Sequence, residues 1–376
     1  IGCYGFKEQE FKCIATNEYL EKRIKIQKSN NKCKFDSGYI LGDLSKKEIQ
    51  DKIYKELENN NVKDLDVLIA TPPCQGMSVA NHKKNNEINR NSLVVESIKI
   101  VNTIKPKVFL FENVSAFLNT ICTDIDKKDK SIGEAIDLNL SGNYNILSKI
   151  VNFKDYGSQS SRTRTLVIGV RKDLTNISPY QLFPKKQKSK SLKELIGHIP
   201  SLNTMGEISE NDIYHSYRKF DLRMLPWIEK LKEGESAFDN KEINRIPHQI
   251  INGEIVFNKN KNGDKYKRWY WDRESPCIHT RNDILASQNT IHPSDNRVFS
   301  IRELMLMMTI PDTFKWSELD FDTLNNISLT EKRKYLKEEE LNIRHCIGES
   351  VPTIIFSTIA KNIKKALNHK QLSTND

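Results

Sequence analysis

The amino-acid sequence predicts an α/β protein built around a parallel sheet of short, buried strands. Three apolar runs carry this prediction: Asp66–Ala70, Val108–Phe111 and Thr165–Val170. Short apolar runs that contain β-branched residues are typical of strands covered on both faces. Between the first two runs, a helix is predicted to begin near Ser92 and to stop at Pro106, because proline cannot continue a helix.

The most informative stretch is Thr71–Ser78, which reads Thr-Pro-Pro-Cys-Gln-Gly-Met-Ser. It follows the first apolar run, so Cys74 is predicted to lie at the carboxyl end of a strand. Open α/β sheets bind ligands at that end, and the two prolines stiffen the backbone that carries the sulfur. Cys74 is therefore a candidate nucleophile, although a free cysteine is more often a small, inert, buried residue.

Further motifs follow in a fixed order. Glu112 and Asn113 come directly after the second run, so a carboxyl and an amide are predicted on the same edge as the cysteine. Arg162 and Arg164 precede the third run. Ile347–Pro352 is predicted to open a final helix, whose apolar residues lie four apart on one face. These apolar residues are Ile355, Ile359, Ile363 and Leu367.

Together, Pro-Cys-Gln, Glu-Asn-Val, Arg-x-Arg and Gly-x-x-Val resemble the motifs of the DNA cytosine-5 methyltransferases, from Ile1 to about Leu367. The resemblance implies a doubly wound, Rossmann-like core that binds S-adenosylmethionine, with a smaller inserted target-recognition domain. It implies methyl transfer to carbon 5 of a flipped-out cytosine in a specific sequence of double-stranded DNA. A lone catalytic core is similar to the bacterial restriction-modification enzymes, whose functional partner is a cognate restriction endonuclease.

The resemblance gives four residues catalytic roles. Carbon 5 of cytosine is a poor nucleophile, so the Cys74 thiolate is expected to add at carbon 6. Protonated Glu112 would donate to ring nitrogen 3, and Arg164 would hold the ring's carbonyl oxygen. Arg162 would orient the loop or a phosphate. No histidine is placed to remove the carbon 5 proton, so water or a phosphate is the expected base.

The resemblance also implies a cofactor site. Glu18 follows a predicted strand, Ile14–Asn17, and an acid about 20 residues after a glycine turn often holds a ribose hydroxyl. Asp43 is expected to reach the adenine amino group. Because the strand that normally precedes the glycine turn in Ile1–Phe6 is missing, we expect a fragment of a protein that begins earlier. The expected cofactor-binding residues are Gly2, Glu18, Asp43, Pro73, Glu349 and Val351.

Gln75, Ser78 and Arg90 are expected to contact DNA, and the polar segment 83–91 to form a loop that closes over it. The predicted domains are 1–172 for catalysis, 173–268 for target recognition, and 269–376 for the rest of the recognition lobe with the C-terminal helix. A lysine series near 185–193 is predicted to be a linker. Aromatic residues that could build a small core follow it: Tyr214, Tyr217, Phe220, Trp227 and Phe238.

Two positions depart from the family pattern. Ser160 stands where a glutamine is usual, with Gln159 one place early, and Glu349 stands where an asparagine is usual. Segments between 269 and 314 resemble the family's ninth motif, which organises the recognition domain. His279 and His292 in these segments are expected to be satisfied polar residues rather than catalysts.

Composition agrees with a polyanionic partner, since 59 basic and 49 acidic residues give a net charge of +10. The seven cysteines form no Cys-x-x-Cys pair, and the histidines show no metal-ligand spacing, so neither a disulfide framework nor a metal site is predicted. No apolar run approaches about 18 residues, and no signal peptide opens the sequence. We expect a cytoplasmic monomer that does not associate with membranes.

Two alternatives remain open. A tRNA cytosine-5 methyltransferase would share Cys74 and Glu112, although the long segment between Arg164 and Trp269 is generous for that branch. A non-catalytic DNA-binding fragment would hold DNA but not the cofactor, and calorimetry of cofactor binding would separate it from an enzyme.

Overall fold

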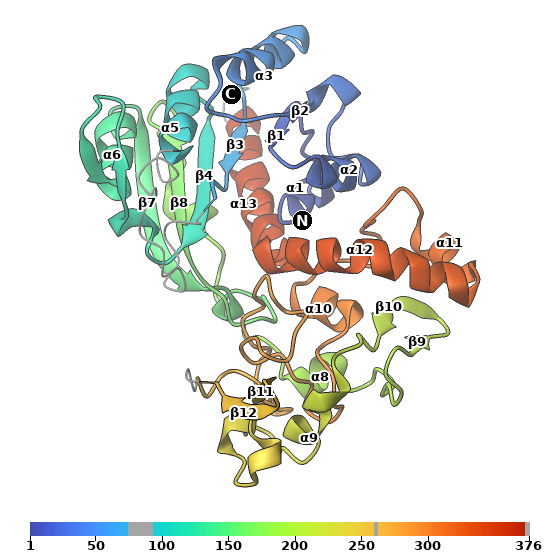
Figure 1. Cartoon of the computed structure of the whole chain (residues 1–376). Helices are drawn as coiled ribbons and strands as arrows, with labels where there is room; N and C mark the ends of the chain where they lie inside the picture. Colours follow the sequence, from blue (N-terminus) through green and yellow to red (C-terminus); the bar gives the residue numbers. More distant parts are fainter. Residues whose placement is uncertain (74–92, 259–261, 373–376) are drawn as a thin grey trace. The chain divides into compact units, whose positions relative to one another are not determined.

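The structure is a computed structural model that describes residues 1–73, 93–258 and 262–372 (Figure 1). The chain forms two compact units, each with its own core. The first, here called the sheet unit, consists of Cys3–Phe153, Thr163–Lys186 and Ile355–Asp376. The second, here called the loop-rich unit, consists of Ile1–Gly2, Lys154–Arg162 and Gln187–Ile354.

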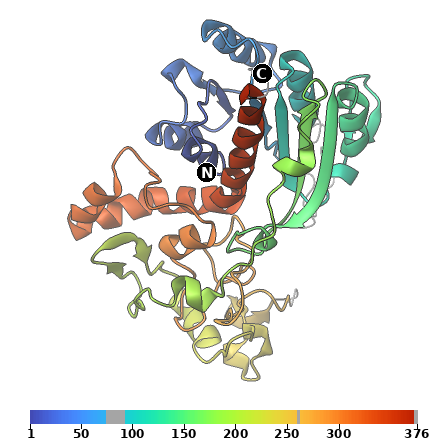
Figure 2. The ribbon, with the colours of Figure 1, turned by 180° about the vertical axis from the view of Figure 1, so that it is seen from behind.

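A four-stranded sheet in the order β3-β4-β8-β7 forms the centre of the sheet unit (Figures 1 and 2). β3 and β4 are parallel, whereas β8 is antiparallel to both β4 and β7. All three apolar runs are confirmed as strands, and the sheet that they join is mixed rather than parallel throughout. The segment between β7 and β8 is too short for the crossover that parallel neighbours require, so they pair as a hairpin. The strands are β3 (Val67–Ala70), β4 (Val108–Val114), β7 (Tyr144–Asn152) and β8 (Thr163–Arg171).

A separate parallel pair, β1 (Thr16–Glu18) and β2 (Tyr39–Leu41), lies in the same unit. β1 confirms a strand that delivers Glu18, although it begins two residues later than Ile14. β3 was expected to be buried, yet each of its residues is only partly buried. Within the described residues β3 pairs with β4 alone, which leaves its other edge uncovered by a strand.

Helices cover the four-stranded sheet on both faces, as in a doubly wound fold (Figures 1 and 2). On one face, α5 (Leu93–Ile104) and α6 (Ile132–Leu140) bury an apolar cluster that includes Phe109, Phe111 and Val167 of the strands. α13 (Thr353–Leu372) lies on the opposite face. α5 and α13 confirm two predicted helices, and Ile355, Ile359 and Ile363 of α13 are fully buried.

The other elements of the sheet unit are α1 (Tyr4–Glu8), α2 (Glu21–Ser29), η1 (Asp36–Gly38), α3 (Lys47–Asn59), η2 (Phe117–Asn119), β5 (Ile121–Thr123), β6 (Asp129–Ser131) and α7 (Pro179–Leu182). After η3 (Phe153–Asp155), the loop-rich unit contains α8 (Leu192–Ile196), β9 (Ile208–Ser209), β10 (Asp212–Ser216), η4 (Leu222–Met224), α9 (Leu225–Ile228), η5 (Ala237–Asp239), η6 (Ile243–Arg245), β11 (His248–Ile251), β12 (Glu254–Phe257), α10 (Ile301–Met307), α11 (Phe321–Asn326) and α12 (Leu329–Glu349).

The core of the loop-rich unit joins segments that are far apart in the sequence. Trp227 and Ile228 pack with Leu285, Ile291 and Val298, and the predicted aromatic residues Phe220 and Phe238 pack against this cluster. The expectation of a small aromatic core is confirmed for Phe220, Trp227 and Phe238, and Tyr217 stacks on Phe220, whereas Tyr214 stacks on Phe321 of α11. The compact unit continues through this core without a break at residue 268, where a domain boundary was predicted. The extent of a target-recognition domain within the unit stays a prediction.

A buried ionic network supports the same unit. Arg297 donates from Nη1 and Nη2 to the two carboxylate oxygens of Glu303 at 2.8 Å each, and its Nε donates to Asp295 at 2.8 Å. His292 Nδ1 accepts the backbone N–H of Asp295 at 3.0 Å, and burial lowers the pKa of His292 to about 4. His292 is therefore a neutral structural residue, as the sequence predicted.

Ile347–Pro352 joins α12 to α13. Glu349 is the last residue of α12, and α13 begins at Thr353. Gly348 is required by close packing, because a Cβ atom there would lie 2.5 Å from the carbonyl oxygen of His279. Within the described part of the chain, no helix combines the length and the apolar character that a membrane span requires.

Candidate active site

The carboxyl ends of β3 and β4 and the amino end of β8 lie along the same edge of the four-stranded sheet. Ala70, the last residue of β3, pairs with Phe111 of β4, and Val114 at the end of β4 pairs with Arg164 at the start of β8. The predicted nucleophile, Cys74, follows β3 by four residues and lies outside the described residues. The same is true of the expected DNA contacts Gln75, Ser78 and Arg90, and of segment 83–91.

Glu112 and Arg164 form an ion pair at this edge. Glu112 is opposite Leu166 and Arg164 is opposite Val114, so the two side chains are diagonal neighbours on one face of the sheet. Arg164 Nε lies 3.3 Å from Glu112 Oε1, and the side chains are only 16% and 8% exposed. Because the two side chains are largely shielded from water, their electrostatic attraction is stronger than that of an exposed pair. The sequence predicted both residues at the site but not the contact between them.

Asn113 fixes the backbone that leads to Cys74. Its Nδ2 donates to the carbonyl oxygen of Pro72 at 2.9 Å, and its Oδ1 accepts the N–H of Val114 at 2.8 Å. The side chain is 3% exposed, so these contacts are shielded from water. Asn113 was predicted to lie on this edge but was given no role. Pro73, the next residue toward Cys74, is exposed.

The predicted cofactor acids Glu18 and Asp43 lie at the carboxyl ends of the paired strands β1 and β2. Glu18 Oε1 accepts the backbone N–H groups of Tyr19 at 2.8 Å and Leu20 at 3.1 Å. Asp43 Oδ1 accepts the N–H of Ser45 at 2.9 Å, and this bond lowers the pKa of Asp43. Tyr19 beside them is 70% exposed. Sequence reasoning missed this ring, although an aromatic residue next to a strand-end carboxyl was a readable signal.

Nearly the whole chain is similar to one protein family. A family model described as C-5 cytosine-specific DNA methylase matches residues 2–365. The chain belongs to this family. The resemblance seen in the motif order and the expectation of an α/β methyltransferase are thereby confirmed.

The curated proteins to which this chain is similar are restriction-modification enzymes. The chain is 30% identical to type II methyltransferase M1.HgaI of Avibacterium volantium, over 96% of this chain and 95% of that protein. It is 24% identical to type II methyltransferase M.XorII of Xanthomonas oryzae pv. oryzae, over 82% of this chain and 70% of that protein. The chain is thus a cytosine-5 DNA methyltransferase of restriction-modification type.

A solved structure agrees on the fold. A candidate DNA modification methyltransferase encoded within an E. coli prophage superposes with a TM-score of 0.61 at 19% identity, over 97% of this chain and 95% of that one. This likeness confirms the α/β methyltransferase architecture that was expected from the sequence.

In this methyltransferase, Arg162 and its neighbours belong to the loop-rich unit. Arg162 is 3% exposed, and its Nη1 donates to the carbonyl oxygen of Ile278 at 3.1 Å. Ser160, which replaces the usual glutamine, donates to the carbonyl oxygen of Pro276 at 2.7 Å. Gln159 Oε1 accepts the N–H of Lys190 at 2.8 Å. These contacts hold the segment around Ile278, so Arg162 orients protein backbone here.

The other predicted cofactor residues also belong to the loop-rich unit. Gly2 lies buried in a turn, Val351 is 5% exposed, and Glu349 is exposed at the end of α12. The structure therefore brings together Glu18 with Asp43, and separately Glu112 with Arg164, each within the sheet unit.

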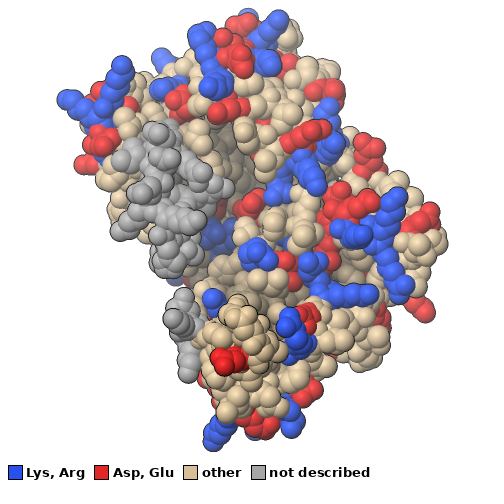
Figure 3. All heavy atoms as spheres, in the orientation of Figure 1, with Lys and Arg blue, Asp and Glu red and all other residues tan. Residues whose placement is uncertain are grey.

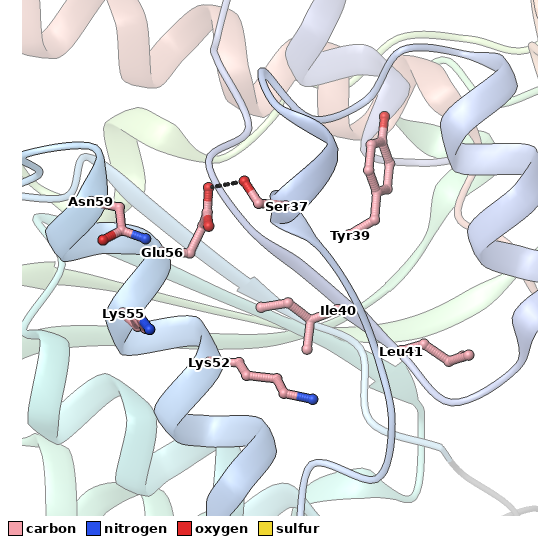
Figure 4. Close-up of a pocket in the computed structure, with 8 residues that line it drawn as sticks. All are labelled: Ser37, Tyr39, Ile40, Leu41, Lys52, Lys55, Glu56 and Asn59. Atoms are coloured by element: carbon pink, nitrogen blue, oxygen red, sulfur yellow. Dashed lines mark hydrogen bonds between the residues drawn. The ribbon is translucent and has the colours of Figure 1, made fainter.

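A cavity of about 370 Å³ lies between β2 and α3 of the sheet unit (Figure 4). Glu56 on its wall is 5% exposed and accepts a hydrogen bond from Ser37 Oγ at 2.9 Å. The cavity contains none of the predicted site residues. Its lining is Ser37, Tyr39, Ile40, Leu41, Lys52, Lys55, Glu56 and Asn59.

Proposed function

We propose that this methyltransferase transfers a methyl group from S-adenosylmethionine to carbon 5 of a flipped-out cytosine, through a covalent adduct with Cys74. The observation that carries the proposal is the shielded pair of Glu112 and Arg164 at the strand edge where the backbone toward Cys74 begins. Such an edge holds an acid and a cation side by side, and the segment that carries the proposed nucleophile follows β3 in the chain.

The reaction needs all three groups. The Cys74 sulfur attacks carbon 6 as a thiolate, and a free cysteine thiol, with a pKa of about 8.5, is mostly protonated at neutral pH. Groups that draw charge from the ring therefore assist the attack. Glu112 would donate a proton to nitrogen 3, and Arg164 would hold the carbonyl oxygen. S-adenosylmethionine supplies an electrophilic methyl group, and loss of the carbon 5 proton then releases Cys74.

The ion pair between Glu112 and Arg164 suggests the order in which these groups act when a cytosine binds. A guanidinium 3.3 Å away stabilises the ionised form of Glu112 in the free protein. When a cytosine enters, its carbonyl oxygen would compete for Arg164. Weakening of this ion pair would favour the protonated acid that the reaction requires.

The residues at the ends of β1 and β2 fit the methyl donor. Glu18 offers a carboxylate for ribose hydroxyls and Asp43 one for the adenine amino group, while the exposed ring of Tyr19 offers a stacking surface. We extend the proposal to Gly2, Pro73, Glu349 and Val351 as further contacts with this donor.

The DNA side of the proposal rests on charge and on the family. Base flipping costs a few kcal/mol, which contacts with phosphates must offset. The net charge of +10 favours such contacts, although basic and acidic side chains are interleaved on the face shown in Figure 3. Gln75, Ser78 and Arg90 are proposed to contact the DNA, and the methylated site would protect host DNA from a cognate endonuclease. We propose a cytoplasmic monomer.

The decisive test expresses the chain in cells and sequences their DNA by a method that detects 5-methylcytosine. We expect methylation within one sequence motif. Cys74→Ser should abolish it while leaving duplex binding within about a few-fold, because a hydroxyl is a far weaker nucleophile of nearly the same size. Methylation of tRNA alone would redirect the proposal to RNA, and an active serine variant would refute the adduct.

Glu112→Gln tests the proposed acid. The amide can donate a hydrogen bond to nitrogen 3 but cannot transfer a proton, so the rate of methyl transfer should fall about 100-fold or more. Glu58→Gln, at an exposed position on α3, is the matched control and should keep the wild-type rate. Equal rates in all three proteins would assign the acid elsewhere.

A further inference from the structure

Cys13 and Cys33 lie side by side in the sheet unit, in the segments that lead into β1 and β2. The two residues are 20 apart in the sequence, and their sulfur atoms are 3.6 Å apart. Their backbones form an isolated parallel bridge just before the two strands. The N–H of Lys34 donates to the carbonyl oxygen of Cys13 at 2.9 Å and helps to hold this pairing. The two thiols therefore face each other across paired backbone.

The backbone geometry suits a disulfide between these two residues. Paired strands lie about 4.8 Å apart, and the Cα atoms of a disulfide are about 4.4–6.8 Å apart. The sulfur atoms would move from 3.6 Å to a bond length of about 2.05 Å. Gly38 permits the close approach of the two segments, because a Cβ atom there would overlap the carbonyl oxygen of Ile14 and lie 3.2 Å from the Cβ atom of Cys33.

The surroundings distinguish the two thiols. Cys13 is partly exposed, whereas Cys33 is 8% exposed. Lys32 Nζ donates to two uncharged acceptors, Thr16 Oγ1 at 2.7 Å and Gln27 Oε1 at 3.1 Å. Burial acts to lower the pKa of Lys32, but the negative charge of neighbouring groups, Cys13 among them, raises it overall. The ammonium therefore favours a thiolate at Cys13, which is also the thiol that a small solute can reach.

We propose that Cys13 and Cys33 form an oxidation site, at which a peroxide converts the two thiols into a reversible disulfide that links the segments leading into β1 and β2. Cys13 is the thiol that the peroxide oxidises, and Cys33 is the thiol that resolves the product. The site is separate from the proposed chemistry of Cys74, and the inference does not depend on methyl transfer.

The reaction takes place in two steps. The Cys13 thiolate attacks one oxygen of hydrogen peroxide, the O–O bond breaks, and hydroxide leaves, so that Cys13 becomes a sulfenic acid. The Cys33 sulfur then attacks the Cys13 sulfur, the S–O bond breaks, and the departing hydroxide takes the Cys33 proton to form water. The two thiols lose two electrons, and the peroxide is reduced to two water molecules. A small thiol in excess reverses the change by thiol–disulfide exchange.

The disulfide would stiffen a weakly supported part of the sheet unit. β1 and β2 have three residues each, and within the described residues they pair only with each other. A two-stranded pair is marginally stable by itself. A cross-link between residues 20 apart restricts the opened chain and so favours the paired state. Glu18 ends β1 and Asp43 follows β2, so oxidation would stiffen the segment that carries both acids.

The test treats the reduced full chain with hydrogen peroxide and maps its peptides by mass spectrometry without reduction. We expect a linked peptide that joins Cys13 to Cys33, has lost two hydrogen atoms, and disappears with dithiothreitol. In Cys33→Ser, Cys13 should remain a sulfenic acid that dimedone captures, whereas in Cys13→Ser the labelling of Cys33 should be about tenfold lower or less. Cys277→Ser is the control, because Cys277 is also partly exposed, and it should form the same linkage as the wild type.

Hydrogen exchange measures the effect of the linkage. Exchange of the amides in β1 and β2 should be about tenfold slower or more in the oxidised protein, with no change in β7 of the same unit. Equal near-ultraviolet circular dichroism of the reduced proteins shows that the variants fold. Oxidation of Cys13 and Cys277 at equal rates, or a linkage of Cys13 to Cys3, would overturn the assignment of the site. A Cys13–Cys33 linkage without slower exchange would overturn its proposed effect on β1 and β2.

Discussion

At the scale of single residues, Tyr19 presents an exposed aromatic ring next to the proposed cofactor acid Glu18. Its ring is 70% exposed directly beside Glu18, at the carboxyl end of β1. An aromatic ring left in water beside a carboxylate gains apolar contact when a purine stacks on it. The acid and the ring together fit a nucleoside better than either does alone.

We therefore expect Tyr19→Ala to weaken the binding of S-adenosylmethionine about tenfold, since stacking on an aromatic ring contributes about 1–3 kcal/mol per base. Isothermal calorimetry of the full chain measures the change. Tyr180→Ala is the matched control, because Tyr180 is 66% exposed on α7 of the same unit and should not affect binding. An equal loss in both variants would mean that the effect is not local stacking.

Cys13 and Cys33 form a pair of neighbouring thiols on the amino-terminal side of β1 and β2. Their sulfur atoms are 3.6 Å apart, and Lys32 Nζ between them in sequence donates to Thr16 Oγ1 at 2.7 Å. A hydrogen bond from the Cys33 thiol lowers the pKa of Cys13 to about 7, against the opposing effect of burial and with help from the charge of Lys32. The same contact and burial raise the pKa of Cys33. Of the two thiols, Cys13 is therefore the one that we expect to ionise first.

The pair predicts the pH dependence of alkylation. The thiolate is the reactive form, so the rate of Cys13 labelling by iodoacetamide should rise through pH of about 7 and level off above it. Peptide mass mapping measures the rate at each pH. Cys122, whose pKa burial raises to about 11, should stay unlabelled over this range. In Cys33→Ala the Cys13 midpoint should move upward, and an unchanged midpoint would contradict the hydrogen bond from Cys33.

At the scale of elements, the segment that leads into α10 is held by charge as well as by apolar packing. Glu303 is 1% exposed and accepts two hydrogen bonds from Arg297. Burial would raise the pKa of Glu303, but the charge of Arg297 outweighs it and lowers the pKa to about 2. A lowered pKa stabilises the folded state above the ordinary pKa of a carboxyl, so the full effect is present at pH 7.

Glu303→Gln should therefore lower the free energy of unfolding of the loop-rich unit by about 3 kcal/mol, because it leaves a buried guanidinium with reduced compensation. Hydrogen exchange in α10, followed against urea concentration, measures the loss within this unit. Glu338→Gln, at an exposed position on α12, is the control and should have no measurable effect. If both variants exchange alike, the network does not stabilise α10.

At the scale of the whole molecule, binding of S-adenosylmethionine should stabilise the folded chain and protect the strand ends that we assign to it. S-adenosylmethionine at 100 times its dissociation constant should stabilise the folded state that binds it by about 2.7 kcal/mol. We expect hydrogen-exchange protection at the ends of β1 and β2, near Glu18 and Asp43. Protection confined to α3 around Lys52 and Asn59 would move the ligand to the cavity of Figure 4 and contradict our assignment.

Much of the candidate site follows from local sequence. Each apolar run forms a strand, so the strand ends that carry Glu112 and Arg164 could be placed from the sequence, whereas their proposed roles come from the resemblance to the family. The same holds for Ile355, Ile359 and Ile363, whose helical spacing predicts the buried face of α13. These features depend on neighbours within a few residues, and the sequence encodes such neighbours directly.

Tertiary structure decided the rest. The antiparallel course of β8 sets Arg164 diagonally from Glu112, and the Cys13–Cys33 contact and the Arg297–Glu303 pair depend on how loops return. The exposure of Ile250 and Ile255 on a projecting hairpin follows from what the rest of the unit leaves uncovered. Sequence patterns determine which residues favour burial or a strand. Which of them meet is determined by pairing direction, register and packing over long separations, and no local pattern contains these.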